Sequence, residues 1–157
     1  LLQYLVSWYW SWLAFILEFR TTNIEDPKKK LTMMIDILSE SDKYDPAISH
    51  IDERILHQII VKESARVYLT KQDDSIKSKY LFKSYDELME MISGYIKAVA
   101  PRYKFSTSLS NTIISTIHRQ IFYAENFPGT ARFSGKENDR KAIARYISHL
   151  VFSCIGK

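Results

Sequence analysis

The sequence predicts an all-α domain. Hydrophobic residues make up 46% of the 157 residues and aromatic residues 13%, which argues against a disordered chain. Only four glycines and four prolines are present, fewer than the many turns of a β-sandwich would need. Apolar residues recur at helical spacing, and no convincing alternation indicates a strand. A chain of this length can bury a core without disulfides or metals, so we expect one domain over residues 1–157.

Charge and cysteine content narrow the class of protein. The net charge of +4 would suit an anionic partner, but the basic residues are scattered except at 28–30 and 140–145. Solvated helix ends explain both groups more simply. Cys154 is the single cysteine, so no internal disulfide can form, and we expect a reducing, cytoplasmic location.

The first helix is expected within "LLQYLVSWYWSWLAFILEF", residues 1–19. Its uncharged run ends at Glu18, at the lower limit for crossing a bilayer, but no basic segment precedes it and its aromatic residues lie in the middle. Gln3, Ser7 and Ser11 recur every four residues and form one polar stripe on a helix. We therefore expect a helix enclosed by others, its stripe facing solvent, a cavity or a partner, and no membrane contact.

The next two helices each begin with the same signal. Asp26 is a suitable N-cap and Pro27 suits the first helical position, so a helix is expected through Leu38. Asp45 and Pro46 repeat the signal before a longer helix that can continue to residue 68 or 69. Residues 70–79 are polar and are expected to form a loop.

Three further helices are expected in the second half. Ser84 and Glu87 form a possible capping box for a helix that stops at Pro101. The helix expected over 106–126 mixes small hydroxyl residues with isoleucines, which suits close packing against another helix. The last helix, expected over 136–155, has Ser134 and Glu137 as a possible capping box and a heptad-like apolar face that needs a partner.

The order of these segments resembles a known family. A long tryptophan-bearing helix, the turn "EDP", a helix of the type "PKKKLTMMIDIL", a capped central helix and two C-terminal helices follow one another. This layout resembles the effector-binding and dimerisation domain of TetR-family bacterial transcriptional regulators over essentially all 157 residues. The family carries a DNA-binding helix-turn-helix domain of roughly fifty residues ahead of this one. Leu1 already lies inside the helical pattern without a cap, so we expect that domain upstream of residue 1.

The resemblance implies how such a protein would act. The helices over 106–126 and 136–155 would pair with their copies in a homodimeric four-helix bundle. A small hydrophobic or aromatic effector would favour a dimer geometry in which the two DNA-binding domains no longer fit successive major grooves of the operator. The candidate residues for the dimer interface are Ile113, Ile117, Ile121, Ile143, Tyr146, Ile147, Leu150, Val151 and Cys154.

The candidate effector pocket is composed of aromatic and soft side chains with a few polar groups. Each of these residues taken alone is more often core than ligand contact. His118 has a stronger case, because its helix is free of charge before Arg119, so it must reach a partner, a ligand or the surface. The candidates are Trp8, Trp12, Phe15, Met34, His57, Tyr68, Met91, Tyr95, Asn111 and His118.

Catalytic, metal and cofactor chemistry is not expected. His50, Glu53 and His57 would share one helix face, but an exposed helix start with ordinary histidines explains them better than a metal site. Cys154 lies on an apolar stripe, where a thiol is normally inert, and neither a nucleophile elbow nor a phosphate loop occurs. Two alternatives to the regulator remain: a non-enzymatic helical interaction protein, groove-binding or membrane-tethered, and an enzyme whose site we do not recognise.

Overall fold

The computed structural model describes residues 2–40, 55–60, 62, 76–127 and 138–156. The fold is all-α, as predicted, and these described ranges contain no strand. Residues 55–60 form a short helical segment within the range predicted for the third helix, most of which lies outside the described residues. The longer helices are α1 (Leu2–Thr21), α2 (Pro27–Ser39), α4 (Ile76–Val99), α5 (Ser106–Asn126) and α7 (Asn138–Ile155).

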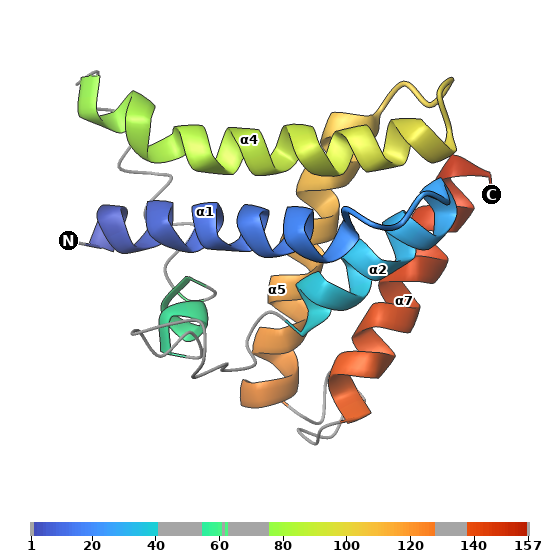
Figure 1. Ribbon diagram of the computed structural model, residues 1–157. Coiled ribbons are helices and arrows are strands. Elements are labelled where there is room, and N and C mark those ends of the chain that lie inside the picture. Colours follow the sequence, from blue (N-terminus) through green and yellow to red (C-terminus); the bar gives the residue numbers. More distant parts are fainter. Residues whose placement is uncertain (1, 41–54, 61, 63–75, 128–137, 157) are drawn as a thin grey trace.

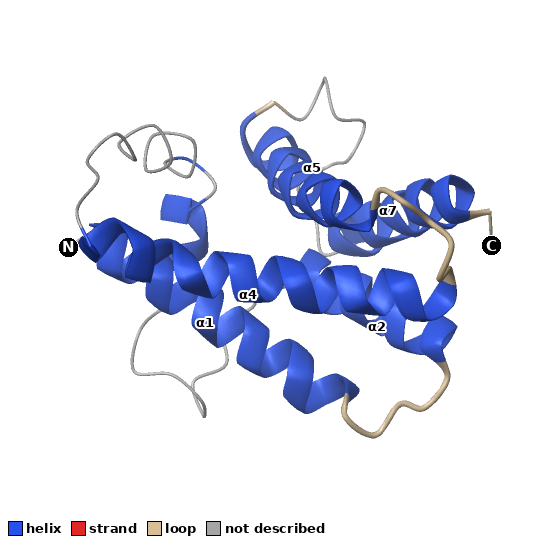
Figure 2. Cartoon of the chain, turned by 90° about the horizontal axis from the view of Figure 1, so that it is seen from above, coloured by secondary structure: helices blue, strands red, loops and turns tan. Residues whose placement is uncertain are grey.

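The helices pack as a bundle in which one pair crosses the other. Figure 1 shows α1 and α4 side by side and running in the same direction, with α5 and α7 steeply across them. Viewed from above in Figure 2, α5 and α7 lie together on one side of the α1–α4 pair. The segment 55–60 lies beside the N-terminal half of α1 (Figure 1), which creates the setting for the site described below.

The polar stripe predicted on α1 faces α4 over part of its length. Ser11 Oγ donates a hydrogen bond to Ser84 Oγ at 2.7 Å, and Ser7 Oγ lies 3.4 Å from the same oxygen. Gln3 and Glu18, at the two ends of the stripe, are exposed. Among the residues that the structure describes, no helix combines the length and the apolar character needed to cross a bilayer.

The predicted start of α2 is confirmed. Asp26 Oδ1 accepts hydrogen bonds from the backbone N–H groups of Lys28 at 2.8 Å and Lys29 at 3.2 Å, and Pro27 occupies the first helical position. The apolar side of the helix, including Leu31, is buried. This cap fixes where the chain turns from α1 into the core.

The start predicted for α4 is wrong. The helix begins at Ile76, inside the predicted loop, and Ser84 lies in its interior. The Ser84 hydroxyl pairs with serines of α1 and does not cap a helix end. Burial of Phe82 against the core favours the earlier start, because packing overrides a weak local capping signal. The end of α4 at Val99, before Pro101, agrees with the sequence.

The helices α5 and α7 form an aliphatic seam. Ile117 of α5 and Ile147 of α7 are buried, and Ser110 of α5 is also buried, as its small side chain predicts. The bounds of α5 agree with the prediction. The capping box predicted at Ser134 and Glu137 lies outside the described residues. The α7 helix ends before Gly156, whose φ of 69° is left-handed and favours glycine.

Candidate functional site

Six aromatic and imidazole side chains meet where α1, α4, α5 and the segment 55–60 converge. We call this set the aromatic–imidazole cluster. Helix α1 contributes three residues near its middle, and the other helices contribute one each. Burial of several polar ring atoms in one place is unusual, since such atoms normally need partners. The members are Tyr9, Trp10, Trp12, His57, Tyr85 and His118.

Tyr9 is the centre of the cluster. Its side chain is fully buried, and its hydroxyl lies 2.9 Å from Nδ1 of His57, a hydrogen bond that joins α1 to the segment 55–60. The Tyr9 ring centroid lies 4.9 Å from that of Trp10, 6.0 Å from that of Trp12 and 6.4 Å from that of His118. These contacts place every other ring except Tyr85 around one phenol.

The second histidine is enclosed by rings. His118 stacks on Trp10 with a centroid distance of 5.6 Å, and it meets the His57 ring edge to face at 5.2 Å. Tyr85 contacts Trp10 from α4, and its hydroxyl donates to Asn111 Oδ1 at 2.7 Å. His118 is thus buried, which corrects the surface position that the sequence left open.

Both imidazoles are held in the neutral form. Burial lowers the pKa of His57 to about 3, with a smaller contribution from the positive charge of Arg140. Burial also lowers the pKa of His118 well below its ordinary value, and the neighbouring His57 adds to this effect. Arg140 itself is paired with Glu125 at 2.9 Å. The cluster therefore offers hydrogen-bonding groups without a formal charge.

Three buried ring nitrogens in the cluster have no hydrogen-bond partner among the described residues: Nε1 of Trp10, Nε1 of Trp12 and Nε2 of His57. A buried polar group without a partner destabilises a fold by about 1–3 kcal/mol. Such groups in a native fold call for an explanation, and a site built to meet an absent molecule is one.

The cluster does not form a metal centre of the usual kind. Within the described ranges, no three His, Cys, Asp or Glu side chains gather closely enough to hold a metal ion. His57 is described, whereas His50 and Glu53 of the considered metal set lie outside the described residues. Nδ1 of His57 is already bonded to Tyr9. The arrangement suits recognition of an aromatic molecule better than ligation.

The sequence candidates for the pocket are only partly brought together. His57, His118 and Trp12 belong to the cluster, and Asn111 touches it through Tyr85. Phe15 is 58% exposed and points out of the bundle, which corrects its assignment to a pocket.

The remaining pocket candidates lie elsewhere. Met34 is fully buried in the core, and Trp8 and Met91 are half-buried against it. Tyr95 of α4 lies beside the C-terminal end of α1, where its hydroxyl is 2.7 Å from Thr21 Oγ1. Tyr68 is outside the described residues.

Sequence reasoning missed the residues at the centre of the cluster: Tyr9, Trp10 and Tyr85. The first helix is apolar around most of its circumference, so periodicity alone did not choose its inner face. A usable signal did exist. Tyr9 lies between Val6 and Leu13 on the line opposite the serine stripe, and a tyrosine on a buried line requires a hydrogen-bond partner.

The candidate dimer interface needs a larger correction. Six of its nine residues are buried by the chain's own helices, so they form the interior of one chain and cannot gain burial against a second. Tyr146 and Cys154 are exposed and Leu150 is half-buried, so Cys154 is not the core filling that its apolar stripe predicted. The six buried residues are Ile113, Ile117, Ile121, Ile143, Ile147 and Val151.

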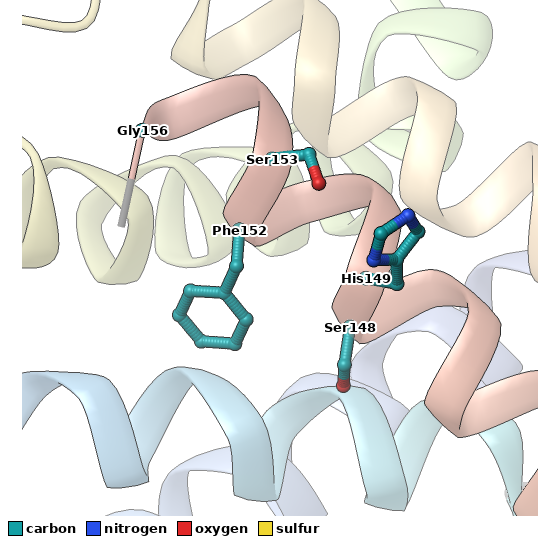
Figure 3. Close-up of a pocket in the computed structure, with 5 residues that line it drawn as sticks. All are labelled: Ser148, His149, Phe152, Ser153 and Gly156. Atoms are coloured by element: carbon teal, nitrogen blue, oxygen red, sulfur yellow. The ribbon is translucent and has the colours of Figure 1, made fainter.

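A shallow groove is lined by residues of α7 near its C-terminal end. Its volume is about 470 Å³, and Figure 3 shows Ser148 and Phe152 directed toward α2 while the His149 ring points away from it. The ammonium group of Lys28 lies 5.4 Å from the centre of the Phe152 ring. The groove is thus lined by polar and aromatic side chains of α7.

No protein-family model, curated protein or solved structure matches this chain.

Proposed function

We propose that this chain is the effector-sensing, homodimerising domain of a TetR-like transcriptional regulator, with the effector bound at the aromatic–imidazole cluster. The observation that carries the proposal is the set of buried ring nitrogens at that cluster that have no hydrogen-bond partner among the described residues. The order of helices resembles that of the family's regulatory domain. Operator DNA would be bound by a separate helix-turn-helix domain and not by this chain.

The position of the cluster suits transmission of a signal. Three of its six residues lie on α1, and in the family resembled here the DNA-binding domain precedes the corresponding helix. An effector that fits one placement of α1 better than another would bias the orientation of the two DNA-binding domains. A hundredfold preference for the released form contributes about 2.7 kcal/mol to the switch.

A thermal-shift screen of hydrophobic and aromatic metabolites tests the proposal. A ligand present at a hundred times its Kd stabilises the folded chain by about 2.7 kcal/mol, which for this length raises Tm by roughly 5–10 °C. We expect the shift of a true effector to shrink in Tyr9→Phe, which breaks the hydrogen bond to His57. Tyr4→Phe, on the exposed side of the same helix, is the matched control and should keep the full shift. A ligand-induced Tm shift of equal size in both variants would show that the ligand does not bind at the cluster.

The proposed homodimer relies on the exposed side of α7. Tyr146, Leu150 and Cys154 are the accessible remainder of the interface predicted from sequence, spaced one turn apart on the helix. Placing a charge there should weaken association, because a charge buried at an interface without a partner is unfavourable. We expect Tyr146→Glu to yield a monomer in sedimentation velocity and Tyr4→Glu on α1 to remain a dimer. A wild-type chain that is monomeric at all concentrations would refute the dimer.

A second candidate function is a helical interaction protein, favoured by a specific observation on α1. Tyr4, Phe15 and Phe19 are 69%, 58% and 71% exposed, and Phe15 and Phe19 stack with centroids 6.1 Å apart. Exposed aromatic side chains on one helix are common at binding surfaces. A monomer that loses a binding partner on Phe19→Ser, while keeping wild-type Tm and giving no ligand shift, would favour this function over the regulator.

A further inference from the structure

The unpartnered groups of the aromatic–imidazole cluster are hydrogen-bond donors. An indole N–H can only donate, which settles the role of Trp10 and Trp12. The Tyr9 hydroxyl lies 2.9 Å from Nδ1 of His57 and donates to it in the tautomer whose ring proton lies on Nε2. In that tautomer Nε2 of neutral His57 is a donor as well. The missing partner must therefore accept hydrogen bonds.

The surroundings of these donors restrict the partner further. Their rings all contact Tyr9, so a molecule beside them would lie against aromatic faces. An aromatic molecule with an acceptor oxygen satisfies both the ring faces and the N–H groups.

Charge decides between a carbonyl and a carboxylate. The cluster contains no cationic side chain of its own, and the closest charge identified, that of Arg140, is paired with Glu125. Burying a carboxylate against neutral donors alone is costly, whereas a carbonyl oxygen is satisfied by such donors. This favours an uncharged ligand.

Resting on the proposed function, we infer that the aromatic–imidazole cluster binds a neutral aromatic carbonyl compound, whose oxygen accepts a hydrogen bond from the unpartnered ring N–H groups of Trp10, Trp12 or His57. The apolar rings supply affinity, and the N–H groups supply selectivity for the carbonyl. A ligand of the same shape without the oxygen leaves the donors unpartnered and is rejected for that reason.

Three small probes that share one ring test the inference on the whole chain: acetophenone, ethylbenzene and benzoate. We expect acetophenone to bind about tenfold more tightly than ethylbenzene, since one buried hydrogen bond accounts for roughly that factor, and more tightly than benzoate. In ¹⁵N-edited NMR spectra, acetophenone should shift downfield the side-chain N–H signal of the ring that donates, whether Trp10, Trp12 or His57. Equal affinity for ethylbenzene, or tighter binding of benzoate, would overturn the inference.

Substitutions locate the donor. Trp12→Phe keeps an aromatic ring at a half-buried position but removes the N–H group. If Trp12 is the donor, the affinity for acetophenone should fall about fivefold. The affinity for ethylbenzene should stay the same. Trp10→Phe provides the same test at the second indole. Tyr123→Phe on α5 removes a hydroxyl that accepts from Arg119 outside the cluster, and it should change neither affinity. A carbonyl preference that survives both tryptophan variants assigns the bond to His57, and it is then lost in His57→Phe; retention there overturns the inference.

Failure of this inference and failure of the proposed function give different results. If a hit from the thermal-shift screen raises Tm while acetophenone binds no more tightly than ethylbenzene or benzoate, the carbonyl inference is wrong and ligand binding stands. If neither the screen nor the probes detect a ligand, both are wrong.

Discussion

Two regions of the core are built on opposite principles. The seam between α5 and α7 is aliphatic, with Ile117, Ile121 and Ile147 fully buried and no polar atom to satisfy. The aromatic–imidazole cluster is equally buried but contains two histidines and three ring nitrogens without a partner in the described residues. Burial of the seam raises the free energy of unfolding, whereas the polar groups buried without a partner in the cluster lower it.

The contrast indicates where function resides. A core selected for stability alone would replace His57 and His118 by leucine or phenylalanine, since neutral histidines buried among rings add little to packing. Polar groups retained at a cost in stability are typical of binding sites. The cluster is therefore the part of the core that we connect with recognition, and the seam is the part that holds the helices in place.

The largest effect in this comparison is expected in the seam. Ile147→Ala should lower the free energy of unfolding by about 2–5 kcal/mol, because it leaves a cavity among residues that have no accessible surface. His118→Leu, which replaces a buried polar ring by an apolar side chain of similar size, should change stability by less than about 1 kcal/mol. Urea unfolding of both variants measures the difference. A larger loss in the free energy of unfolding for His118→Leu than for Ile147→Ala would show that the cluster, and not the seam, stabilises the fold.

Acid should weaken the cluster and leave the seam unaffected. In the unfolded chain His57 titrates near pH 6.5, whereas its folded pKa is lowered to about 3, so the unfolded state binds more protons between these values. The free energy of unfolding therefore falls as the pH drops below about 6.5. His57 alone accounts for about 2 kcal/mol between pH 7 and pH 5, and the lowered pKa of His118 acts in the same direction.

Urea unfolding at pH 7 and pH 5 measures this dependence. The His57→Leu, His118→Leu double variant should lose most of it, whereas His149→Gln, which alters an exposed histidine on α7, should retain the wild-type dependence. A double variant as acid-sensitive as wild type would mean that other groups cause the effect.

Local signals in the sequence predicted much of the fold and little of the site. The cap at Asp26 and the stop before Pro101 depend on neighbouring residues, and both were predicted correctly. The start of α4 depends on packing of Phe82, a long-range contact that no capping signal reveals. Helix ends that depend on neighbouring residues can thus be predicted from the sequence, whereas those that depend on tertiary packing cannot.

The cluster illustrates the same limit. His57 and His118 were selected from sequence as possible orienting polar groups of a pocket, but their contact joins positions far apart in the chain. The exposed helix start expected around His57 is wrong, because its side chain is buried. Tyr9 was overlooked because a helix that is apolar nearly all round does not reveal its inner face. The seam was misassigned for a related reason. A heptad-like stripe on α7 predicts that the stripe is buried, but not whether its own chain or a second subunit covers it.

The smallest effect on stability is expected for Ser84, which lies next to the aromatic–imidazole cluster. Ser84 joins α4 to α1 beside the cluster, through hydroxyl contacts with Ser11 and Ser7 that are partly open to solvent. Ser84→Ala should lower the free energy of unfolding by only about 0.5–1 kcal/mol, since water can replace the lost partner of an accessible hydroxyl. Ser115→Ala, at an exposed position of α5, should change it less. A loss well above this range in Ser84→Ala would show that the serine contacts position α1, and with it the cluster, more strongly than their exposure suggests.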